Sequence, residues 1–142
     1  MKLWIRMLIV TLVLGLPAFA LGPVLWPPTP DMTPTAQQLP YFMFISAIEA
    51  LLFGFGVSFA FFGWKLVKKT DEKHKGMTVA MFIALIWLMV SWWPHDNLHI
   101  HNGINMQGLL YIEYGFHVTL IIASVFIANY VWGSLKRDAR HR

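Results

Sequence analysis

The sequence has no cysteine in its 142 residues and only 13% charged residues, about half the level of an average soluble domain. Without cysteine, disulfides, thiolate metal ligands, iron–sulfur clusters and thiol redox chemistry are excluded. The shortage of charge argues against a water-soluble globular domain. A phosphate-binding glycine loop, a nucleophile elbow and a dinucleotide-binding fingerprint are also missing, which excludes conventional kinase, hydrolase and dehydrogenase classes.

Long apolar runs are what the chain has instead, since 57% of its residues are hydrophobic. These runs cover residues 3–26, 41–67, 77–93 and 109–135. A bilayer core is crossed by about 20 helical residues, and none of the runs alternates as a β-barrel strand does. The sequence therefore predicts an all-α integral membrane protein, with residues 1–142 forming a single four-helix bundle in contact with lipid.

The first run has a second interpretation. A basic start followed by an apolar stretch and Ala18-Phe19-Ala20 is also typical of a cleaved secretory signal. The stretch continues past Ala20 to Trp26, which is longer than a signal core. We therefore favour a retained transmembrane helix over a cleaved signal peptide.

Positive charge predicts the direction of insertion. All 11 Lys and Arg residues lie near the N-terminus, at or near the connection between the second and third runs, or at the C-terminus. The connections 27–40 and 94–108 contain none. The positive-inside rule thus predicts a cell-membrane protein with cytoplasmic termini and with outer loops at 27–40 and 94–108. The net charge of +4 is explained by insertion and does not indicate nucleic-acid binding.

Among acidic residues and histidines, three fall inside the apolar runs: Glu49, Glu113 and His117. A charged group at the centre of a membrane helix costs about 2.5–3.5 kcal/mol on insertion scales, so such residues are functional candidates. At about 1.5 Å per residue, all three lie roughly 6–15 Å below the outer helix ends. Glu113 and His117 are four residues apart and therefore share a helical face.

The predicted outer loop at 94–108 holds the other polar candidates: His95, Asp96, His99 and His101. A helical turn would place His95 and His99 on one face, whereas an extended segment would place His99 and His101 together. Either conformation can direct two imidazoles toward Glu113 and His117.

Imidazole and carboxylate groups that converge at one end of a bundle are typical ligands of copper, zinc, iron or manganese. Haem is disfavoured, because only one histidine is embedded in an apolar run. The predicted metal ligands are His95, His99, His101, Glu113, His117, Glu49 and Asp96.

Each of these features also has a structural explanation without a metal. The loop histidines could be solvated, Glu113 and His117 could form a hydrogen-bonded pair that joins two helices, and a protonated Glu49 could bond to Ser46.

Three functions are therefore open: a metal site for redox chemistry or metal handling, a non-catalytic accessory subunit of a larger respiratory or oxygenase complex, and a proton or cation transport component that uses Glu49, Glu113 and His117. Other membrane subunits or further copies of the chain are the expected partners. The sequence does not decide whether the protein is an enzyme.

Small residues predict where helices approach closely. Gly54 and Ser58 are four residues apart, as are Gly56 and Ala60, and such pairs allow close packing of membrane helices. Gly115 belongs to a similar face in the fourth run, where we expect the same behaviour.

Overall fold

A computed structural model describes the backbone of residues 1–140, and their side chains except those of residues 66, 73 and 137–140. The described chain is helical and contains no strand. Its elements are α1 (Leu3–Leu25), η1 (Pro30–Met32), α2 (Leu39–Lys68), α3 (Glu72–Asn102), α4 (Met106–Ile112), η2 (Glu113–Val118) and α5 (Thr119–Arg140). η1 is a short 3-10 turn in the first connection, and η2 is a π-helical segment that joins α4 to α5.

Four helical stretches are long and apolar enough to cross a membrane, which confirms the predicted number of long apolar helices. They are Leu3–Leu25, Leu39–Lys65, His74–Asn102 and Met106–Lys136. The predicted orientation stays a prediction. Of the cations on which it rests, Lys73, Arg137, Arg140 and Arg142 lie outside the described side chains.

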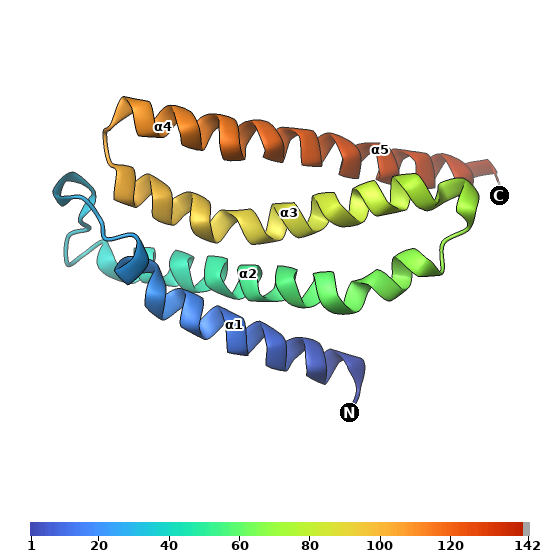
Figure 1. Cartoon of the computed structure of the whole chain (residues 1–142), viewed down its shortest axis with the longest axis horizontal. Helices are drawn as coiled ribbons and strands as arrows, with labels where there is room; N and C mark the ends of the chain where they lie inside the picture. The colour runs from blue at the N-terminus through green and yellow to red at the C-terminus, as the bar shows by residue number, and fades with distance from the viewer. Residues whose placement is uncertain (141–142) are drawn as a thin grey trace.

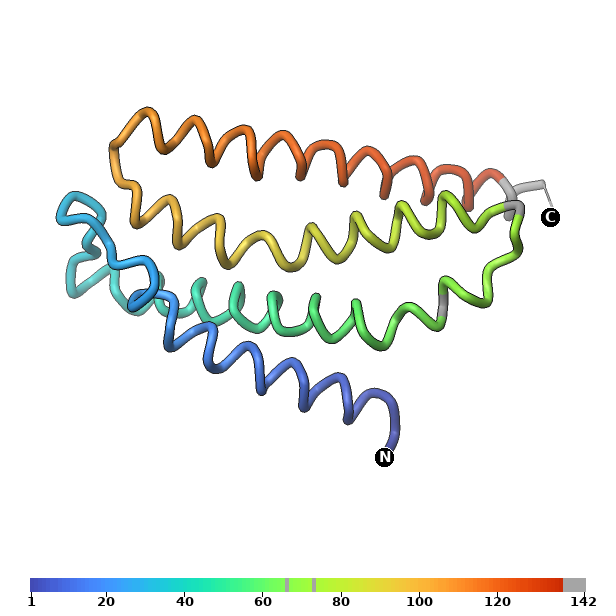
Figure 2. The backbone as a smooth tube through the Cα atoms, in the orientation of Figure 1, coloured from blue at the N-terminus to red at the C-terminus, as the bar shows by residue number. Residues whose placement is uncertain are grey.

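The helices are arranged in a row rather than around a closed core (Figures 1 and 2). α2 packs between α1 and α3, and α3 packs between α2 and α5. The start of α1 and the end of α5 lie at the same end of the helices, and the connections 26–38 and 103–105 lie at the opposite end of the helices, which we call the linker end. α5 therefore packs chiefly on α3 and leaves much of its surface uncovered.

The close approach predicted for the small residues of α2 is confirmed. A Cβ added at Gly54 would overlap the carbonyl oxygen of Thr11 in α1, and one added at Gly56 would lie 2.9 Å from the Cβ of Met89 in α3. Ser58 donates a hydrogen bond to the Met7 carbonyl at 3.1 Å. The expectation for the fourth run is wrong at Gly115, because a Cβ there would meet nothing within 4 Å.

α3 continues through Pro94 and ends at Asn102, nine residues beyond the predicted end at Trp93. The predicted outer loop from 94 to 108 is thus reduced to residues 103–105. A proline removes one backbone donor, and membrane helices tolerate that loss where neighbouring helices support the chain. The helix stops at Gly103, whose φ of 56° suits glycine and whose N–H donates to the His99 carbonyl at 3.0 Å.

Candidate metal centre

Three histidines from two segments meet near the linker end of the helices. His95 and His99 lie one turn apart on α3, and His117 lies on η2. Each can offer one ring nitrogen such that the three atoms lie within 4.8 Å of one another. We call these three residues the His triad. Its spacing is compatible with a single bound metal ion.

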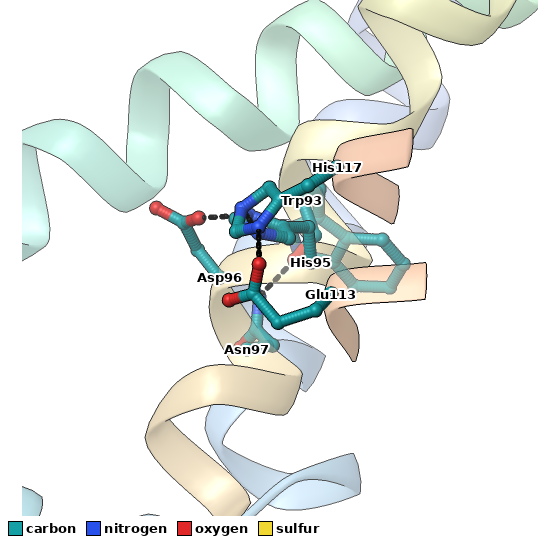
Figure 3. Close-up of polar contacts among 6 residues, drawn as sticks. All are labelled: Trp93, His95, Asp96, Asn97, Glu113 and His117. Atoms are coloured by element: carbon teal, nitrogen blue, oxygen red, sulfur yellow. Dashed lines mark hydrogen bonds and ion pairs between the residues drawn. The ribbon is translucent and has the colours of Figure 1, made fainter. Parts of the chain in front are cut away.

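A carboxylate orients each of two rings in the His triad. His95 donates from Nδ1 to Asp96 at 2.6 Å, and His117 donates from Nδ1 to Glu113 at 2.5 Å. Figure 3 shows the two carboxylates reaching the two rings from different directions. Metal-binding histidines commonly make this bond with the nitrogen that does not bind the metal, since it selects the tautomer and holds the ring in place.

The two remaining ring nitrogens face each other. The Nε2 atoms of His95 and His117 are 2.8 Å apart. When Nδ1 carries the proton of a neutral imidazole, Nε2 carries a lone pair. Two lone pairs at this distance repel unless a proton or a metal ion lies between them. The ring of His99 is 4.6 Å from that of His95 and 5.8 Å from that of His117, between centroids.

The site is enclosed on one side and open on the other. The side chain of His95 is 7% exposed and packs edge-on against Trp92 and Phe116. In contrast, the side chains of His117 and Glu113 are 40% and 50% exposed. This difference follows from the row of helices, because η2 and α5 have α3 on one side and no described helix covering the other. A ligand can therefore reach the His triad from the η2 side.

Trp87 on α3 holds the π-helical segment in place, a role that no sequence motif reveals. Its indole Nε1 donates to Thr119 Oγ1 at 2.9 Å, and its ring stacks on Phe116 at 6.0 Å. Thr119 is the first residue of α5, directly after the turn that carries His117. π-helical turns occur often at functional sites. The position of this tryptophan in the middle of an apolar run is the only signal that the sequence offers.

Three of the predicted ligands lie next to the His triad rather than in it: Glu113, which bonds to His117, Asp96 and Glu49. Asp96 bonds to His95. Glu49 on α2 is 8% exposed and lies against Asp96, in a cavity of about 200 Å³ that His99 and Ser46 also line. Side chains from α2, α3 and η2 thus come together, as the shared depth of Glu49, Glu113 and His117 predicted. Whether any of them binds a metal stays a prediction.

His101 is placed apart from the other histidines. It is exposed, and its Nδ1 donates to the carbonyl of Pro27 at 2.8 Å. The backbone N–H of Thr29 donates to the Ile100 carbonyl at 3.3 Å. These bonds attach the first connection to the end of α3. His101 therefore has a structural partner of its own, because the helical turn points it away from His95 and His99.

Comparisons of this chain with models of protein families, with curated proteins and with solved structures find no match. The function must therefore be argued from the site.

Proposed function

We propose that this chain is a membrane protein that binds one transition-metal ion through His95, His99 and His117. The observation that carries the proposal is the pair of carboxylate-oriented imidazoles whose Nε2 atoms lie 2.8 Å apart, with a third imidazole beside them. Nitrogen donors of this kind suit zinc, copper and iron.

The spacing needs little adjustment to accept an ion. Two nitrogens bound to one tetrahedral metal at about 2.0–2.1 Å lie about 3.3 Å apart. The Nε2 atoms of His95 and His117, at 2.8 Å, would have to separate by about 0.5 Å. Small side-chain rotations provide that much, and they would move His117 toward its open side. The ion would also remove the repulsion between the two lone pairs.

Three protein ligands leave one position of a tetrahedral ion free. Structural zinc sites are closed by four protein ligands, whereas catalytic sites keep a position for water or substrate. The half-exposed His117 is on the side from which such a ligand would arrive. The arrangement therefore favours metal-dependent chemistry or metal handling near the membrane surface over a purely structural metal.

A second candidate function is favoured by α5. Only 11% of the apolar window in the fourth span is buried, the least of the four spans. Glu113 and His117 are half-exposed on the same side, where contact with lipid would be costly. An accessory role, with α5 covered by a subunit of a larger membrane complex, would protect these groups. Purification in mild detergent tests this: a stoichiometric partner supports it, and a chain that is monodisperse and binds metal alone contradicts it.

Elemental analysis tests the metal site. The purified full chain should carry, or take up, about one zinc, copper or iron per chain. A variant with His95→Ala and His117→Ala should lose that ion. The matched control is His101→Ala, which removes an imidazole outside the His triad and should keep it. Equal metal content in the double variant and the native chain would refute the proposed site.

A further inference from the structure

Two adjoining cavities lie beside the His triad at the linker end. They share three lining residues, Phe42, Ser46 and Ile100. The smaller, of about 200 Å³, is the one that contains Glu49 and Asp96. The larger has a volume of about 430 Å³, within the range of small-molecule sites. Together they form a space with one polar end and one apolar end.

Apolar side chains make up most of the larger cavity. Phe19 and Pro23 contribute from the end of α1, and the connection that follows contributes Trp26, Met32 and Pro34. That connection is attached to the end of α3 by the bonds described above, so the wall exists without a ligand. Such a surface suits a hydrocarbon chain or ring that enters from the lipid.

Hydrogen-bond acceptors line the polar end. Glu49 is 8% exposed, and its carboxyl lies beside that of Asp96. The described residues provide no hydrogen-bond partner for the hydroxyl of Ser46, which lines both cavities. The two carboxyl groups are joined by a hydrogen bond and therefore share one proton, and the oxygens that this bond leaves free accept hydrogen bonds and repel anions. The head of a ligand here should therefore donate a proton, as a hydroxyl group does, and should carry no negative charge.

We propose that the joined cavities bind a lipid-soluble molecule with a hydroxyl head on an apolar body, with the head at Glu49 and Ser46 and the body against Phe42 and Trp26. This site goes beyond the proposed metal function and does not require the ion. A hydroquinone with an alkyl tail and a long-chain alcohol share this chemistry, and the test distinguishes them.

The test is photolabelling of the full chain in lipid nanodiscs without added metal. The probe is a long-chain alcohol with a diazirine in its chain, and the comparison probe is the matching alkane. The alcohol should label peptides from residues 19–46 about tenfold more strongly than the alkane, as expected for a hydrogen bond to a carboxylate. Equal labelling by the two probes would overturn the proposal.

Two variants test the two ends of the site. Ala20→Phe, at an exposed position that lines the larger cavity, should reduce labelling by the alcohol about tenfold. Ala128→Phe, an equal change at an exposed position on α5, should leave it unchanged. Glu49→Met keeps the side-chain volume and should remove the preference for the alcohol over the alkane. Native labelling in Ala20→Phe, or a preserved preference in Glu49→Met, would also overturn the proposal.

Competition and metal independence complete the test. Displacement of the probe at lower concentrations of decyl hydroquinone than of dodecanol identifies a hydroquinone as the preferred ligand, and the reverse order identifies an alcohol. Displacement by neither contradicts a hydroxyl site. The variant with His95→Ala and His117→Ala should still be labelled, so that loss of the metal site and loss of this site give different results. If labelling disappears there, an independent site is refuted.

Discussion

Replacing Glu113 by glutamine tests whether the carboxylates serve the His triad. The change keeps the shape of the side chain and removes the charge that faces Nδ1 of His117. Outer-shell partners of metal-binding histidines typically contribute 10–100-fold to metal affinity. The Glu113 side chain is 50% exposed, so water replaces part of its effect. We therefore expect Glu113→Gln to lower the metal affinity by about tenfold, the lower end of this range.

Asp96→Asn provides the comparison. Asp96 is 36% exposed and orients a histidine that is 7% exposed. Less water is available to compensate there, so we expect a larger loss, closer to about 100-fold. Metal affinity is measured by competition with a chromophoric chelator in detergent. The control is Glu72→Gln, which removes an 82% exposed carboxylate paired with Lys75 and should not change the affinity. Native affinity in both Glu113→Gln and Asp96→Asn would refute the role of the carboxylates.

Three further predictions concern the framework of the site. Trp87→Phe removes the hydrogen bond to Thr119 and should lower the free energy of unfolding by about 0.5–1.5 kcal/mol; an unchanged thermal midpoint would contradict this. Gly54→Ala should destabilise the protein by about 1–3 kcal/mol through overpacking against α1. Gly76→Ala, where a Cβ meets nothing within 4 Å, should cause no loss, and equal midpoints for these two glycine variants would count against close packing. His101→Ala should increase protease cleavage within residues 27–38, since it removes one of the bonds that attach the first connection to α3, and an unchanged cleavage rate would argue against the contribution of that bond.

The sequence predicts the four spans well because length and hydrophobicity alone determine them. It predicts the pairing of Glu113 with His117 for a similar reason: the two are four residues apart, and the structure joins them by a hydrogen bond. Properties that depend on one helix are thus accessible from the sequence. The row of helices and its open face on α5 depend on packing between helices, which the hydrophobic pattern does not encode.

The end of α3 shows a second limit. Pro94 is compatible with either a helix end or a continued helix, and local propensity does not choose between them. Contacts of His95 with His117 and Phe116 from another segment accompany the continued helix. That conformation determines which histidines come together. It places His95 beside His99 and turns His101 toward the carbonyl of Pro27, a partner 74 residues earlier in the chain.

X-ray absorption spectroscopy of the zinc- or copper-loaded chain tests the central claim most directly, because it counts the imidazoles bound to the ion. We expect three imidazole ligands in the native chain and two in His99→Ala, with no change in His101→Ala. A spectrum without imidazole scattering, or one that loses a histidine in His101→Ala and not in His99→Ala, would contradict the account.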